Sequence, residues 1–148
     1  MATRGIVRFA KRKEGVSFNE HPERTEVQIY NHYDSYPEGL GVDLAKFLSD
    51  FRVVNGLGED TSKIANGMGC LTAQLIASIK DGPGNVYVEN PDTKRGDIEY
   101  TYYIWVAENK DIWISIFSGG LGHNPDCIFV GEPDELLEKY KPNTNNDG

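Results

Sequence analysis

The sequence lacks the motifs of the common nucleotide-hydrolysing, metalloprotease and serine-hydrolase enzymes. It contains no GxGxxG after a strand pattern, no GxxxxGKS/T loop, no HExxH and no GxSxG, and each of those motifs supplies a defined part of a catalytic site. Paired His-x-Thr/Ser motifs are absent as well. We therefore expect none of these standard catalytic mechanisms.

Long apolar runs and cysteines are also scarce. No apolar run reaches the roughly 18 residues that a membrane-spanning helix needs, and no apolar block follows the basic N-terminus. The two cysteines, Cys70 and Cys127, lack the CxxC spacing of a zinc site. These absences predict a cytoplasmic protein with no membrane partner and no cofactor, in which both thiols are reduced and buried.

Basic residues are few in the second part of the chain. Acidic and basic side chains balance in residues 1–80, so the whole net charge of −8 falls in residues 81–148. Because duplex DNA or RNA is bound through clustered lysine and arginine, this charge argues against a duplex nucleic acid as the partner. The charge itself is sufficient to keep a small protein soluble.

The periodicity of apolar residues predicts an α+β fold. We expect a mostly antiparallel sheet of five or six strands, because consecutive strand patterns joined by short turns favour hairpins. Two consecutive helices after the second strand should cover one face, and a short helix should end the domain. The single domain is expected to span residues 1–141, with a disordered tail at 142–148. The expected strands are 3–10, 26–33, 85–89, 98–106, 111–117 and 127–130, and the expected helices are 40–51, about 60–80 and 133–140.

The two longest strand patterns have one aliphatic and one aromatic face. In residues 98–106, alternation places Ile98, Tyr102 and Ile104 on one side, and Tyr103 and Trp105 on the other. Trp113 and Phe117 extend the aromatic side in the next strand. The aliphatic face should pack under the helices. The aromatic face predicts a homo-oligomer, most simply a dimer, unless the short C-terminal helix covers it.

Residues 30–41 contain the densest group of functional side chains. They read Tyr-Asn-His-Tyr-Asp-Ser-Tyr-Pro-Glu-Gly-Leu-Gly, at the join between a strand and a helix pattern. His32, Asp34 and Glu38 could hold a proton acceptor or part of a metal site, since imidazole titrates near neutral pH and carboxylates orient it or bind metals. The alternative is a structural turn in which Asp34 and Glu38 cap backbone amides of the helix.

Two further groups are candidates for a site. His123, Asn124 and Asp126 lie on a glycine-rich loop, and a metal site would be completed if that loop approached His32. Arg4 and Arg8 share one face of the first strand. If the first two strands form a hairpin, the two arginines lie on the face of Tyr30 and His32, where guanidinium groups beside aromatic rings suit a nucleotide.

The motif at Tyr30 to Gly39 resembles one found in a scattered set of small bacterial and bacteriophage proteins. In that set a strand ends in Tyr-x-His-x-Asp-Gly-Tyr-Pro-x-Gly. The matching residues here are Tyr30, His32, Asp34, Tyr36, Pro37 and Gly39, with Ser35 in place of the usual glycine. The resemblance covers about a quarter of the chain and carries no established activity. It implies a phage or bacterial protein that binds a host factor or a signalling nucleotide.

Three functions remain open from the sequence. The first is binding of a small phosphorylated or nucleotide-like ligand, such as a host defence signal that a phage protein would sequester. The second is a metal-dependent hydrolase or phosphodiesterase that uses His32, Asp34, His123 and Asp126. The third is a protein interaction module that uses the aromatic sheet face. For the first function, the ligand-binding residues are expected to be Arg4, Arg8, Tyr30, His32, Asp34, Tyr36 and Glu38.

Overall fold

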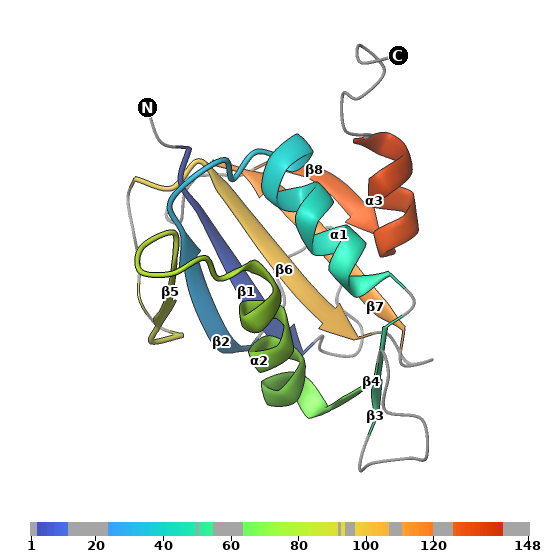
Figure 1. Cartoon of the computed structure of the whole chain (residues 1–148). Coiled ribbons are helices and arrows are strands. Elements are labelled where there is room, and N and C mark those ends of the chain that lie inside the picture. Colours follow the sequence, from blue (N-terminus) through green and yellow to red (C-terminus); the bar gives the residue numbers. More distant parts are fainter. Residues whose placement is uncertain are drawn as a thin grey trace.

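A computed structural model gives the fold of the chain as one six-stranded sheet with three helices (Figure 1). It describes residues 3–11, 24–49, 51–54, 64–91, 93, 97–106, 111–119 and 126–140. The expected tail at 142–148 and the loop that carries His123 and Asn124 lie outside the described residues.

The elements follow one another in an α+β order, and the sheet order is β5-β2-β1-β6-β7-β8. A separate parallel pair, β3-β4, lies beyond the end of this sheet (Figure 1). The bounds are β1 (Gly5–Lys11), β2 (Arg24–Asn31), the π-helical turn η1 (Pro37–Gly41), α1 (Val42–Leu48), β3 (Arg52–Val54), β4 (Ile64–Asn66), α2 (Gly67–Ile79), β5 (Val86–Glu89), β6 (Tyr100–Val106), β7 (Ile112–Ser118), β8 (Asp126–Gly131) and α3 (Pro133–Lys139).

The sheet is mixed, which corrects one part of the expected fold. Four of its five strand pairs are antiparallel, but β1 and β6 are parallel, with Gly5 opposite Tyr100. The N-terminal strand therefore lies in the middle of the sheet. Each hairpin has a local turn signal, whereas the β1–β6 pair joins strands far apart in the sequence and has no such signal.

The helix arrangement also differs from the expectation. Helices α1 and α2 are not consecutive, because the β3-β4 pair separates them, and α2 begins at Gly67. Gly67 has a φ of +84°, which suits glycine at this abrupt change from strand to helix. Close packing does not require glycine at Gly67 or at Gly69, since a Cβ added at either residue would meet nothing within 4 Å.

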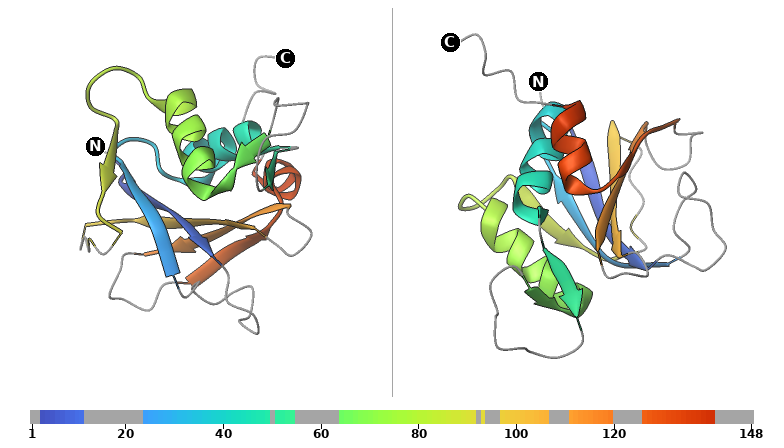
Figure 2. Two further views of the ribbon diagram at one scale, coloured as in Figure 1. Left: turned by 90° about the horizontal axis from the view of Figure 1, so that it is seen from below. Right: turned by 90° about the vertical axis from the view of Figure 1, so that its right-hand side faces the viewer.

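All three helices cover the same face of the sheet (Figures 1 and 2). Helix α2 contacts β1 and β2, α3 contacts β7 and β8, and α1 lies between them and packs against α3. The short C-terminal helix therefore does not cover the aromatic face. The main core fills the space under the helices, with Ile29, Tyr102 and Ile114 of the sheet against Leu44, Leu71, Leu75 and Leu136 of the helices.

The alternation predicted for β6 is confirmed within the strand. Tyr102 and Ile104 lie in the main core, while Tyr103 and Trp105 belong to a second cluster on the opposite face. Ile98 precedes the strand and departs from the predicted face: it packs with Ile6 and Tyr30 on the side away from the helices.

The aromatic face is buried within a single chain. Tyr103, Trp105 and Phe117 are each no more than 2% exposed, and the Trp105 ring stacks on Trp113 with centroids 5.5 Å apart. The expected homo-oligomer required these rings to be exposed, and their burial removes the reason to expect one. The cysteines are both free, and each is partly buried.

Candidate functional site

Part of the motif forms a rigid corner between β2 and α1. Ser35 is completely buried, and its hydroxyl oxygen accepts a hydrogen bond from Asn31 Nδ2 at 2.9 Å. The Tyr102 hydroxyl donates to the Ser35 carbonyl oxygen at 2.7 Å. Gly5 is required next to this corner, since a Cβ there would lie 2.6 Å from the Ser35 Cβ. Ser35 is thus a packing residue, and the positive φ of the turn occurs at Asp34 instead.

The second half of the corner depends on Gly39. The Asp34 carbonyl accepts a hydrogen bond from Leu40 N, and a Cβ on Gly39 would lie only 2.5 Å from that same oxygen. Pro37 is buried at the start of η1, and the Val42 amide reaches back to the Pro37 carbonyl. Because of these contacts, the structural parts of the motif are Asn31, Ser35, Pro37 and Gly39. The π-helical turn next to them is of a kind that is rare and occurs often at functional sites.

His32 belongs to a different environment, a hollow beside the edge strand β5. Its Nδ1 lies 2.7 Å from the Tyr30 hydroxyl, and its ring meets the Tyr33 ring edge-on with centroids 4.5 Å apart. Tyr87 of β5 pairs with Tyr30 across the ladder. We call this the aromatic hollow; it has a volume of about 350 Å³ and is lined by Tyr30, His32, Tyr33, Gly84, Asn85 and Tyr87.

Two rings of the aromatic hollow are accessible to a ligand. Tyr33 is 56% exposed and Tyr87 is 50% exposed, while Tyr30 is buried behind them. Among the described residues, the exposed large apolar or aromatic side chains are these two, Tyr36 and Val88. Exposed aromatic rings around a concave surface are typical of a binding site.

The turn between α2 and β5 holds the other wall of the aromatic hollow. The Asn85 side chain donates to the Ile79 carbonyl, and the Asn85 carbonyl accepts from the His32 amide at 2.9 Å. Lys80 donates to the carbonyls of Gly84 and Val86 and lies over the Tyr87 ring, 5.4 Å from its centroid. This turn is thus fixed to the end of β2. Sequence reasoning missed Lys80, Asn85 and Tyr87, because only the β2–β5 pairing brings them to His32.

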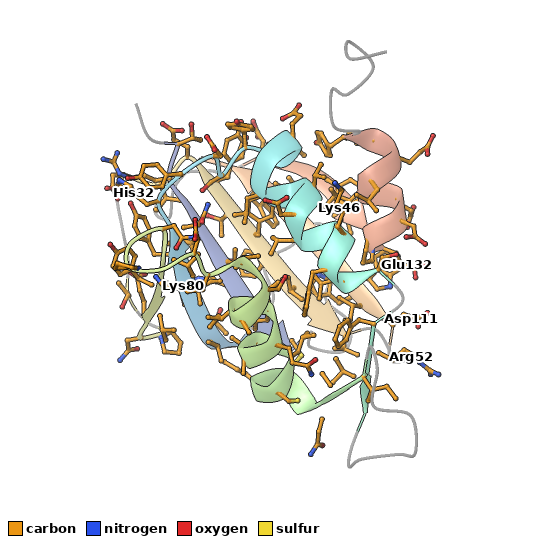
Figure 3. All side chains as sticks on the ribbon, viewed as in Figure 1. His32, Lys46, Arg52, Lys80, Asp111 and Glu132 are labelled. Atoms are coloured by element: carbon orange, nitrogen blue, oxygen red, sulfur yellow. The ribbon has the colours of Figure 1, made fainter. Side chains whose placement is uncertain are left out.

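Two more hollows lie next to the first. One, of about 180 Å³, is lined by Asn31, Asp34, Leu40 and Asp43, and it shares Tyr33 and Asn85 with the aromatic hollow. The other, of about 500 Å³, lies between α1 and α2 and is lined by Asp43, Lys46, Phe47, Ser78 and Ile79. We call these the acidic hollow and the helix hollow. In Figure 3, His32 and Lys80 lie on the side of β2 and β5, and Lys46 lies on α1.

The acidic hollow carries two carboxylates. Partial burial raises the pKa of Asp43; the Lys46 charge acts in the opposite direction, and the Asp34 charge adds to the increase. Asp34 also raises the pKa of Tyr36, first through its charge, with burial second. The charge of Asp34 thus raises the pKa values of both Asp43 and Tyr36, which places the three side chains near one another.

The predicted ligand-binding residues are only partly brought together. Tyr30 and His32 line the aromatic hollow and Asp34 lines the acidic hollow, whereas Tyr36 and Glu38 line neither. Glu38 instead contributes to the raised pKa values of Tyr100 and Tyr140, for both of which burial is the largest cause. The charge of Glu38 thus acts at the start of β6 and the C-terminal end of α3.

Arg4 and Arg8 are held by other partners. The predicted β1–β2 hairpin is confirmed, with Arg8 opposite Gln28. Arg8 Nε donates to Gln28 Oε1 at 2.8 Å, and its guanidinium lies over the Tyr103 ring. Arg4 forms an ion pair with Asp97 at 3.6 Å. Neither arginine lines the aromatic hollow.

The proposed metal ligands do not assemble into one site in the described part of the chain. Asn31, next to His32, is opposite Gly5, and the same row runs through Tyr100 and Ser118 to Asp126. Asp126 is therefore four strands away, roughly 19 Å along the sheet. His123 lies outside the described residues, among which no group of three or more His, Cys, Asp or Glu side chains could hold a metal ion.

Comparison with known proteins gives no family. None of the family models, curated proteins or solved structures compared with the chain matches it. The resemblance of the motif to small bacterial and phage proteins thus stays a prediction. Within the described residues, none of the helices has the length and apolar character needed to cross a membrane.

Proposed function

We propose that the chain binds a small ligand with a planar, nucleobase-like ring in the aromatic hollow. The observation that carries this proposal is the pairing of two half-exposed rings, Tyr33 and Tyr87, with the hydrogen-bonded Tyr30–His32 pair in a single concave surface. The volume of about 350 Å³ falls within the range of roughly 300–1,000 Å³ that is usual for small-molecule sites.

The chemistry of this surface favours a flat heteroaromatic ligand over an aliphatic one. Every nucleobase presents a π face, and stacking of one base on an aromatic side chain contributes about 1–3 kcal/mol. Both His32 and Asn85 add polar groups at the wall of the hollow, and few such groups are needed to orient a ring. The walls are also preorganised, because the Asn85 carbonyl is hydrogen-bonded to the His32 amide.

The biological part of this proposal rests on the motif resemblance. A phage-encoded protein of this kind would sequester a signalling nucleotide in the cytoplasm of its host, without a catalytic step. Binding alone is sufficient for that role, since a ligand held in the hollow is removed from its receptor by mass action.

The test is a titration of the protein with the four common ribonucleoside monophosphates, together with native mass spectrometry of the protein as it is purified. We expect at least one of them to bind, and we expect Tyr87→Ala to weaken that binding roughly 5- to 150-fold through the loss of one stacking surface. His32→Ala should weaken it as well while changing the melting temperature little, because His32 is only half-buried.

Val88→Ala is the matched control. Val88 is the next residue of the same edge strand, is 66% exposed and points to the opposite side from Tyr87. It should leave binding unchanged. If no nucleotide binds and nothing co-purifies, or if Tyr87→Ala binds as tightly as the unmodified chain, the proposal is wrong.

A further inference from the structure

The three hollows lie in series. The aromatic hollow shares Tyr33 and Asn85 with the acidic hollow, and the acidic hollow shares Asp43 and Ile79 with the helix hollow. The series leads from the end of β2, where Asn31 lines the acidic hollow, to the surface between α1 and α2, and we call it the trough. A ligand with its ring in the first hollow would meet the other two in this fixed order.

The side chains along this trough change character in a fixed order. Tyrosine and histidine rings come first, then the carboxylates of Asp34 and Asp43, and finally Lys46 and Ser78. Asp43 and Lys46 are three residues apart on α1, so both lie on the same side of that helix. The sequence of surfaces is thus aromatic, then hydrogen-bond accepting, then cationic.

A nucleoside 5′-phosphate has the same order of groups. Its base can stack on tyrosine, its ribose hydroxyls can donate to carboxylates, as they do in dinucleotide sites, and its phosphate requires a cation and hydroxyl donors. The reverse orientation is unfavourable, because it would place the phosphate in the aromatic hollow, whose described lining residues include no lysine or arginine. The nucleotide is thus the better match to the whole trough, and a free base would leave most of it empty.

Given the proposed function, on which this inference rests, we propose that the ligand is a nucleoside 5′-phosphate that lies along the trough. Its base occupies the aromatic hollow, its ribose hydroxyls face Asp34 and Asp43, and its phosphate is bound by Lys46 with Ser78. Lys46 and Ser78 thereby take the role that the sequence suggested for Arg4 and Arg8, which are engaged by Asp97 and Gln28.

The experiment compares parts of one ligand. The tightest of the four ribonucleoside monophosphates is titrated by calorimetry beside its nucleoside, its free base and its 2′,3′-dideoxy monophosphate. We expect affinity to fall about tenfold on removal of the phosphate and about tenfold on removal of the ribose hydroxyls, because each loss leaves a charged side chain without its partner. Added salt should weaken binding of the monophosphate and leave binding of the nucleoside unaffected.

Variants assign each effect to its residue. Lys46→Ala should weaken binding of the monophosphate about tenfold and leave binding of the nucleoside unchanged. Asp43→Asn should reduce the difference in affinity between the ribonucleoside and dideoxynucleoside monophosphates. Lys139→Ala removes the same charge on α3, away from the trough, and should change neither.

The outcomes separate this inference from the proposed function. If base, nucleoside and monophosphate bind equally and Lys46→Ala has no effect, while Tyr87→Ala still weakens all three, the trough assignment is wrong and the aromatic hollow remains the binding site. If none of the four ligands binds at any concentration up to the millimolar range, both are wrong. A loss of monophosphate binding in Lys139→Ala equal to that in Lys46→Ala would also overturn the assignment.

Discussion

The Tyr102 hydroxyl is the contact through which the central sheet holds the motif corner, so its removal should lower stability measurably. Tyr102 is completely buried. Its hydroxyl donates to the Ser35 carbonyl at 2.7 Å. Tyr102→Phe removes this bond and takes away a partner of a buried backbone carbonyl. A buried polar group that loses its partner costs about 1–3 kcal/mol.

From this value we expect Tyr102→Phe to lower the free energy of unfolding by about 1–3 kcal/mol. For a chain of this size that corresponds to a fall in melting temperature of about 2–12 °C. The assay is urea denaturation followed by circular dichroism and by the fluorescence of Trp105 and Trp113, with the m-value unchanged. Tyr87→Phe, which removes a hydroxyl from an exposed edge strand, should cost less than about 0.5 kcal/mol.

The same side chain gives the experiment a second arm at high pH. Burial raises the pKa of Tyr102 well above its ordinary value, so the folded chain keeps the proton when the unfolded chain loses it. Stability supplied by this group is therefore complete below the unfolded pKa of about 10 and declines as the pH rises beyond it. Tyr102→Phe should show a shallower decline than the unmodified chain. A loss below 0.5 kcal/mol at neutral pH, with an unchanged alkaline decline, would refute the reasoning.

Two further substitutions examine the corner and the trough. Gly39→Ala should lower stability by about 1–3 kcal/mol, because its Cβ would lie 2.5 Å from the Asp34 carbonyl oxygen; Gly69→Ala, whose Cβ meets nothing, is the control, and equal melting temperatures for both variants would contradict the expectation. Asp43→Asn should stabilise the fold relative to the unmodified chain at pH 7, and do so less at pH 4, since a carboxyl whose pKa is raised by burial destabilises the fold once the pH exceeds that pKa. Thermal melts of both chains at the two pH values check the sign. A variant that is less stable than the unmodified chain at pH 7 would show that the charge of Asp43 is favourable.

Local patterns predicted most of the elements, because their signals lie within a few residues. The alternation of Tyr102 and Ile104 with Tyr103 and Trp105 gave the two faces of β6 correctly. Non-local pairing had no such signal. The parallel β1–β6 pair, the β3-β4 pair between the helices and the burial of the aromatic face by the same chain all depend on contacts between distant residues.

The same limit applied to the site. Tyr30 and His32 could be named as candidate site residues from the sequence, because residues that merely fill a core are rarely this polar at the end of a strand. Lys80, Asn85 and Tyr87 were not, since their relevance arises only when β5 pairs with β2. Asp34 and Gly39 could be assigned to a turn from the sequence, but the contact of Gly5 with Ser35, thirty residues along the chain, could not.

The central place of β1 affects how the chain folds during synthesis. The ribosome makes β1 before the other strands of this sheet, and β2 can pair with one edge of β1 soon afterwards. Its other edge must wait for Tyr100, which at about 5–20 residues per second emerges roughly 5–20 s later. For that interval the nascent hairpin presents an open edge, with Val7 and Phe9 beside it, to any other extended chain nearby. Slower translation over residues 32–99 should therefore increase misassembly between neighbouring nascent chains.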